Sequence, residues 1–147
     1  MKIILEYNNS TRSSVDRSFL KSVIEKTLQE SGCDFLCDAS VRVSVALVSP
    51  EKIQEINKIY RGQDNITDVL SFSEYKNKSE LRKALGDEVF LGEILLCYDD
   101  IMCYAKSMRV DGKEEFACAL SHGVLHLLGL RHGERMFSIQ KRVSEQI

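Results

Sequence analysis

All three histidines of this 147-residue chain lie within the eleven residues from His122 to His132. His122 and His126 are four residues apart, so on a helix both imidazoles project from one face, with Cβ atoms roughly 5–6 Å apart. Gly129 follows, and glycine readily takes the positive φ that ends a helix. The chain is therefore expected to form a helix that stops near Gly129 and turns, which brings His132 back towards the first two histidines.

Three neutral imidazoles that converge on one point are the usual protein ligands of a catalytic zinc ion, whose fourth position stays open for water. The alternative is that these histidines only pack in the core or lie on the surface, as single helical histidines usually do. Their spacing, with no histidine elsewhere, favours a metal site. We predict that His122, His126 and His132 bind one Zn²⁺ ion. Cys118, one turn before His122, is a conceivable fourth ligand.

The spacing H-x-x-x-H-x-x-G-x-x-H is also that of the metzincin peptidases. Those enzymes place a glutamate directly after the first histidine as general base, whereas this chain has Gly123. Because glycine has no side chain that accepts a proton, peptide hydrolysis by that route is not expected.

Length and composition are those of one globular domain, with 44% hydrophobic and 29% charged residues. No apolar run is as long as a membrane span, and Glu6 comes too early for a signal peptide, so we expect a cytoplasmic protein with no membrane contact. The five cysteines form no C-x-x-C pair, which indicates reduced, small core residues. A net charge of −2 gives no overall attraction to nucleic acid.

Apolar residues alternate or run together in four segments, which predicts strands at about 3–7, 41–47, 67–72 and 89–98, the last of them central. Residues 73–88 are polar and are expected to form a loop with partial helix. Helical spacing predicts five helices. The first lies between a capping Ser13 or Ser14 and Gly32, and the second begins at Ser49-Pro50. The other three lie at about 99–108, at about 113–128 and around 136–143. The Ser49 helix is expected to bury Ile53, Ile56 and Tyr60. The fold class is a single α+β domain over residues 1–147, a small mixed β-sheet of about four strands covered by about five helices.

Three blocks of the chain resemble the YbeY family of bacterial metal-dependent endoribonucleases, also called rRNA maturation factors. The residues from His122 to His132 resemble the family pattern H-G-x-L-H-L-x-G-x-D-H. Residues 57–72 resemble N-x-x-[YF]-R-x-x-D-x-x-T-[DN]-V-L-S-F, and 91–94 resemble L-G-D-I. The chain departs from these patterns at Arg131 and Glu93, where the family has aspartate, and at Ser73, where a proline is common.

The resemblance implies a zinc-dependent endoribonuclease that cuts single-stranded RNA, in 16S rRNA 3′-end maturation and ribosome quality control. Single-stranded RNA and the small ribosomal subunit are the implied partners. Within the second block, Arg61 is expected to contact phosphate, because guanidinium binds phosphate in bidentate fashion. The alternative for Arg61 is a surface residue at a helix end. Thr67, Asp68 and Ser71 are expected to be turn and strand-edge residues.

Glu93 is expected to act as a base or to support a metal ligand, or else to face solvent. RNA binding by a slightly acidic chain would need a local basic surface. The candidate residues are Arg61, Lys76, Lys78, Arg82, Lys83, Arg131, Arg135, Lys141 and Arg142. Two other functions stay open at this point: a ribosome-assembly or rRNA-binding factor with a mainly structural metal, and a metallohydrolase of small substrates.

Overall fold

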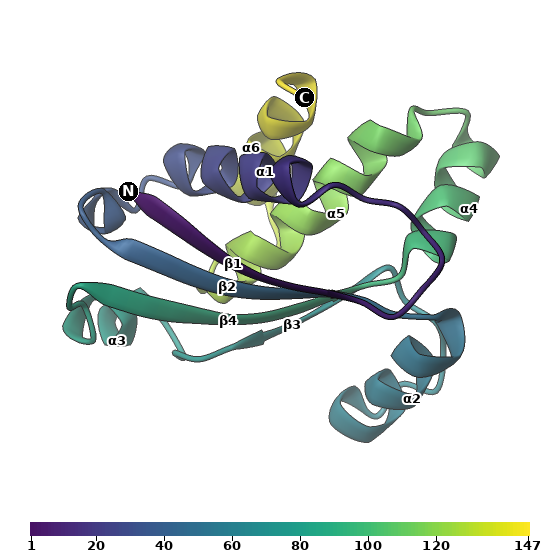
Figure 1. Cartoon of the computed structure of the whole chain (residues 1–147), viewed down its shortest axis with the longest axis horizontal. Coiled ribbons are helices and arrows are strands. Elements are labelled where there is room, and N and C mark those ends of the chain that lie inside the picture. Colours follow the sequence, from purple (N-terminus) through teal and green to yellow (C-terminus); the bar gives the residue numbers. More distant parts are fainter.

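Four strands form one mixed sheet in the order β1-β2-β4-β3 in the computed structural model, which describes all 147 residues (Figure 1). β1 (Lys2–Asn9), β2 (Ser40–Leu47) and β4 (Glu88–Leu96) run parallel. β3 (Val69–Ser73) pairs with β4 in the antiparallel direction and forms one edge. The predicted mixed sheet of four strands is confirmed, and β4 is central as expected.

Six helices accompany the sheet: α1 (Arg17–Glu30), α2 (Pro50–Arg61), α3 (Lys78–Lys83), α4 (Tyr98–Met108), α5 (Gly112–Leu127) and α6 (Glu134–Glu145). A 3₁₀ turn at Asp34–Leu36 precedes β2. α1, α5 and α6 lie together on one face of the sheet, whereas α2 lies on the other side, near the edge that β3 forms (Figure 1). The helix beyond the predicted five is α3, which occupies the segment expected to be a loop with partial helix.

The core lies between the sheet and the α1–α5–α6 layer, as one cluster of 30 buried residues. Alternate residues of β2 point into it, and Val41, Val43, Val45 and Leu47 are fully buried. This period-two burial is the pattern that predicted the strand. A smaller apolar cluster around Ile53 lies under α2.

The start of α1 differs from the prediction. Asp16 occupies the N-cap position, and neither Ser13 nor Ser14 caps the helix. The reason is that β1 holds the preceding segment in place. The Asn9 amide donates to the carbonyl of Ser13 at 2.7 Å, and the Tyr7 hydroxyl donates to the carbonyl of Val15 at 3.0 Å.

α2 begins as predicted, with the Ser49 hydroxyl accepting a hydrogen bond from the Lys52 amide. Its buried face, however, differs from the predicted one. Ile53 is buried, but Tyr60 is 67% exposed, so its expected burial was wrong. Asn57 is buried instead, and its side chain donates to Asn65 in the loop before β3.

The cysteines only partly follow the expectation of core residues. All five are free thiols. Cys33 and Cys97 are buried, but Cys37 and Cys103 are exposed and Cys118 is half-buried. As to the membrane, none of the helices has the length and apolar character needed to span one.

Candidate functional site

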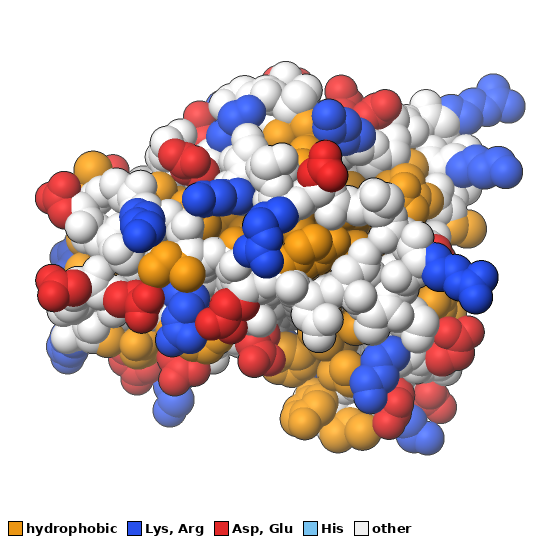
Figure 2. Space-filling view, in the orientation of Figure 1, with side chains coloured by type: hydrophobic (Ala, Val, Ile, Leu, Met, Phe, Trp, Pro, Cys, Tyr) orange, Lys and Arg blue, Asp and Glu red, His pale blue; other side chains and the backbone are white.

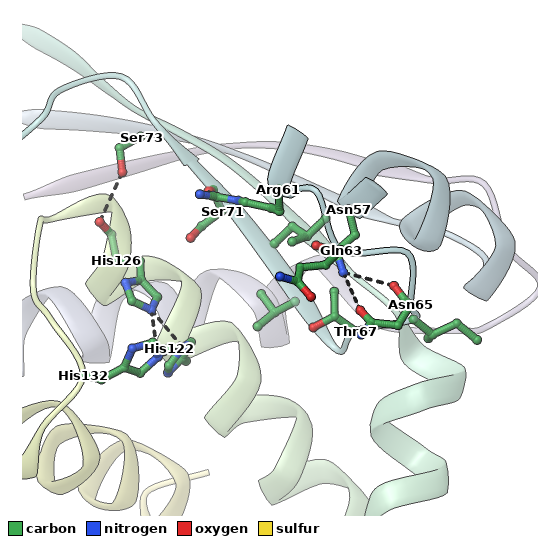
Figure 3. Close-up of a pocket in the computed structure, with 13 residues that line it drawn as sticks. Asn57, Arg61, Gln63, Asn65, Thr67, Ser71, Ser73, His122, His126 and His132 are labelled. Atoms are coloured by element: carbon green, nitrogen blue, oxygen red, sulfur yellow. Dashed lines mark hydrogen bonds between the residues drawn. The ribbon is translucent and has the colours of Figure 1, made fainter. Parts of the chain in front are cut away.

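The three histidines converge at the end of α5. His122 and His126 lie on the last two turns of this helix, which ends at Leu127. Gly129 then adopts φ +85°, and the chain turns so that His132 faces back. The Nε2 atom of His126 lies 2.9 Å from that of His122 and 3.3 Å from that of His132, and the remaining pair is 3.2 Å apart (Figure 3).

These separations fit a single metal ion. Imidazole nitrogens at 2.0–2.1 Å from a tetrahedral Zn²⁺ would lie about 3.3 Å from one another. The electrostatics agree, because coordination requires neutral imidazoles. Burial, reinforced by the neighbouring imidazoles, lowers the pKa of His126 to about 4. Burial also lowers the pKa of His122. The cluster could therefore hold a metal ion at neutral pH.

Gln140 of α6 supports His122 from the side away from the cluster. Its Oε1 lies 3.4 Å from His122 Nδ1, and its Nε2 donates to the carbonyl of Cys118 at 3.2 Å. A hydrogen on Nδ1 leaves the Nε2 lone pair facing the other histidines. Cys118 itself directs Sγ towards the backbone of α6, 3.9 Å from the carbonyl of Gln140, and does not join the histidine cluster. No sequence pattern indicated Gln140, since a glutamine on an amphipathic helix usually faces solvent.

Replacement of Gln140 with leucine should therefore weaken metal binding about 10- to 100-fold, because the acceptor that orients His122 is lost. Gln140→Glu keeps an acceptor and should bind metal nearly as the wild type does. Competition with a chromophoric chelator measures the affinity, and Lys141→Ala, at the neighbouring exposed position, is the control. Equal affinities of the wild-type and Gln140→Leu proteins would contradict this role.

A cavity of about 720 Å³ opens beside the histidines. Its opposite wall is formed by the end of α2, the loop that follows and the edge strand β3 (Figure 3). Arg61, the last residue of α2, lies in this wall, so the structure brings Arg61 and the histidines to one cavity. Its Nη2 donates to the carbonyl of Ser71 at 2.6 Å, and its charge contributes to the low pKa of His126, after burial and the two imidazoles.

Polar side chains that the sequence analysis did not assign to the site line the same wall. Asn57, Gln63, Asn65, Thr67 and Ser71 all face this cavity. Asn57 fixes the loop by donating to the backbone and side-chain oxygens of Asn65 at 3.0 and 2.9 Å. Thr67 and Ser71 were expected only as turn and strand-edge residues. The second family-like block, residues 57–72, was the signal that could have identified this wall.

β3 is tied to the histidine helix directly. The Ser73 hydroxyl donates to the carbonyl of His126 at 3.1 Å. This bond joins the two walls of the cavity at one end, next to the metal-binding candidates (Figure 3).

Glu93 does not line this cavity, and it is exposed, which fits the alternative of a solvent-facing residue and not that of a base or a support for a metal ligand. It lines a different cavity together with Phe72 and Leu95. Ile94 is the neighbour that faces α5, where it packs against Gly123. Because side chains alternate along a strand, Glu93 points to the opposite face of the sheet. A Cβ atom at Gly123 would lie 2.9 Å from Ile94, so the missing side chain there lets α5 approach β4.

Of the expected RNA-binding cations, only Arg61 lines the histidine cavity. Two others are held elsewhere, since Arg135 donates to the carbonyl of Ser31 and Arg142 to the carboxylate of Glu30. Arg131, in the place of the family's aspartate, is exposed beside His132. At this cavity the expected basic surface therefore consists of a single guanidinium, that of Arg61.

Comparison with known proteins agrees with the resemblance in the three blocks. The family model for endoribonuclease YbeY matches residues 6–147. An endoribonuclease YbeY from Caldicellulosiruptor saccharolyticus is 34% identical, over 100% of this chain and 94% of the relative. One from a Sulfurihydrogenibium species is 31% identical over 90% and 84%. The solution structure of a Thermotoga maritima protein, 27% identical, matches with a TM-score of 0.61 over 97% of this chain and 88% of that one. This chain belongs to the endoribonuclease YbeY family.

Proposed function

We propose that this protein is a metal-dependent endoribonuclease that hydrolyses single-stranded RNA. The observation that carries the proposal is the approach of three histidine Nε2 atoms to within 2.9–3.3 Å at a cavity that also contains Arg61. Membership of the endoribonuclease YbeY family supports RNA as the substrate.

The proposed ligands are His122, His126 and His132, and the proposed ion is Zn²⁺, which three imidazoles suit. Such an ion would activate water and withdraw negative charge from a phosphate. No aspartate or glutamate lines the cavity, so its side chains include no carboxylate that could act as the general base.

Arg61 is proposed to hold the phosphate. One of its donors is committed to the carbonyl of Ser71, which fixes the guanidinium in place and leaves other donors free for the phosphate oxygens. A guanidinium held in advance compensates the negative charge that develops on these oxygens during cleavage. The amide of Gln63 and the hydroxyl of Ser71 are available for further hydrogen bonds to the strand, whereas the Thr67 hydroxyl donates to the carboxylate of Asp68.

From the family resemblance we further propose that the substrate is the 3′ region of 16S rRNA, that the enzyme takes part in ribosome quality control with the small subunit, and that it acts in the cytoplasm. With a net charge of −2, its attraction for RNA must be local. Binding should accordingly weaken as salt rises.

An assembly factor with a structural metal is the second candidate. Structural zinc sites take all four ligands from protein. Here the fourth candidate, Cys118, contacts the backbone of α6 instead. A position left open for a non-protein ligand favours the catalytic reading.

The test is to incubate the Zn²⁺-loaded protein with an end-labelled RNA that carries a single-stranded tail and a hairpin stem. We expect internal cuts in the tail, an intact stem, loss of cleavage with a chelator and recovery when Zn²⁺ is restored. Tight RNA binding without cleavage under all these conditions would support the assembly factor. Hydrolysis of a small phosphodiester alone would support a metallohydrolase of small substrates.

In the same assay, Arg61→Ala should lower kcat/KM about 100-fold or more, the usual cost of removing one donor that stabilises transition-state charge. Arg61→Lys keeps the charge but loses the bidentate geometry and should be intermediate. Metal content should not change, because Arg61 contributes no ligand. Lys21→Ala on α1, an exposed site remote from the cavity, is the control for lost positive charge. Equal losses in the Lys21 and Arg61 variants would argue against a phosphate contact.

A further inference from the structure

Hydrophobic side chains remain exposed at the end of α2, on the side of the sheet edge opposite the histidine cavity. Ile59 is 65% exposed and Tyr60 is 67% exposed. Figure 2 shows hydrophobic side chains gathered at the lower edge of the molecule, over α2. Beside them lies a second cavity of about 550 Å³, whose lining includes Tyr60, Phe72 and Leu95.

Arg61 lies between this surface and the histidine cavity. The Arg61 Cζ atom lies 5.3 Å from the centre of the Phe72 ring, while its Nη2 donates to the carbonyl of Ser71. Tyr60 packs on the same Phe72 ring edge to face, with centroids 5.5 Å apart and an interplanar angle of 72°. Ser71 and Phe72 are consecutive residues of the edge strand and point to opposite faces. Arg61 thus lies on the rim of the histidine cavity, against a side chain that lines the second cavity.

The Tyr60 ring is suited to stacking. It is rigid, has a free aromatic surface and is held by the contact with Phe72. Stacking of a nucleic-acid base on such a ring depends little on sequence, since every base has a π-face. Tyr60 does not serve as a core residue, because two thirds of its surface is exposed to solvent.

The charges around the second cavity indicate which part of a nucleotide would enter. Glu55 and Glu93 line it together with one cation, Lys52, whose Nζ lies 3.6 Å from Glu55 Oε2. The carboxylate of Glu93 has no such partner, so the cavity keeps a net negative charge that would repel a phosphate. Carboxylates do accept hydrogen bonds from the amino groups of bases. The backbone of a bound strand would therefore stay at the rim near Arg61, and a base would turn towards Tyr60.

We propose that a base of single-stranded RNA, next to the nucleotide held in the histidine cavity, passes the rim at Arg61 and stacks on Tyr60. The Tyr60 surface would thus extend the substrate site beyond the reacting phosphate. This inference rests on the proposed ribonuclease function and adds a positioning residue to it.

The test compares the wild type with Tyr60→Ala, Tyr60→Leu and Tyr60→Phe, all loaded with Zn²⁺, on single-stranded RNA of increasing length. For long RNA, the alanine and leucine variants should raise KM about 5- to 100-fold with little change in kcat, as expected for a lost base–aromatic contact. Tyr60→Phe keeps the ring and should resemble the wild type. A nucleoside phosphodiester that carries a single base, and therefore has no neighbouring base to stack on Tyr60, should be cut equally by all four proteins. Tyr104→Ala, which removes another half-exposed tyrosine on α4, is the control.

The leucine variant preserves an apolar contact with Phe72, so a loss shared by leucine and alanine reflects the missing ring and not a disturbed fold. If the wild type cuts RNA and Tyr60→Ala has an unchanged KM, the stacking proposal is wrong, the ribonuclease proposal stands, and the surface is left for a protein partner. Equal losses in Tyr60→Phe and Tyr60→Ala would also overturn stacking. If the wild type neither binds nor cuts RNA, the proposed function itself fails.

Discussion

The His126→Ala protein is expected to lose both its metal ion and RNA cleavage. His126 Nε2 lies within 3.3 Å of the Nε2 atoms of both other histidines, so its removal leaves two ligands. Metal affinity should fall by more than the 10- to 100-fold expected for loss of the support from Gln140. Elemental analysis after dialysis measures the metal, and the labelled-RNA assay measures cleavage. A variant that keeps one bound ion and cuts RNA at the wild-type rate would disprove the proposed site.

The pH dependence of the metal-free protein tests the same residue without reference to activity. The pKa of His126 is about 4 in the folded protein, against an ordinary value of 6.5. As the pH falls from 6.5 to 4, the unfolded chain takes up a proton that the folded chain refuses, so stability decreases across this range. Above pH 6.5 this loss is absent. Melting temperatures in chelator at pH 7.5 and pH 5 should therefore differ less for His126→Ala than for the wild type.

The histidine site could be predicted from the sequence because its geometry is local. A separation of four residues on one helix places two imidazoles together, and a glycine with φ +85° at position 129 returns the third. All of this lies within the residues from His122 to His132. The position of Arg61 relative to the histidines could not be derived in this way. It depends on the pairing of β3 with β4 and on the packing of α5 over both strands, and only the family resemblance suggested it.

The sequence left two alternatives open for Glu93, which is exposed, and gave the wrong burial for Tyr60, for related reasons. The face on which Glu93 lies depends on the register of β4, and a shift of one residue reverses every side chain. For Tyr60, helical spacing indicated a buried stripe with Ile53 and Ile56. The neighbours of α2 cover only the part around Ile53, and the buried polar residue is Asn57. Periodicity thus located both elements, but tertiary packing decided what their side chains face.

Replacement of Gly92 with alanine is expected to cause the largest loss of stability. Gly92 lies in the middle of β4 with φ +141°, a conformation that side chains rarely adopt. A Cβ atom there would collide with the carbonyl oxygen of Phe72 and lie 2.9 Å from Leu127 Cδ2. Backbone strain and overpacking each cost about 1–3 kcal/mol, which suggests a loss of about 3 kcal/mol or more. In a chain of this size the melting temperature should fall by roughly 6–12 °C.

The substitution should also weaken metal binding, because the two groups that the new methyl would displace belong to elements that support the metal site. Phe72 is part of β3, where the hydroxyl of the next residue, Ser73, donates to the carbonyl of His126, and Leu127 is the last residue of the histidine helix. Calorimetry and metal titration of the same variant would measure both effects. Gly86→Ala, where an added Cβ meets nothing within 4 Å, should change the free energy of unfolding by no more than about 0.5 kcal/mol. A Gly92→Ala protein as stable as Gly86→Ala would contradict the close approach. If the expected losses are found, the family-like block at 91–94 is explained by the glycine that lets β3, β4 and α5 meet, and not by the carboxylate of Glu93, which faces away from the histidines.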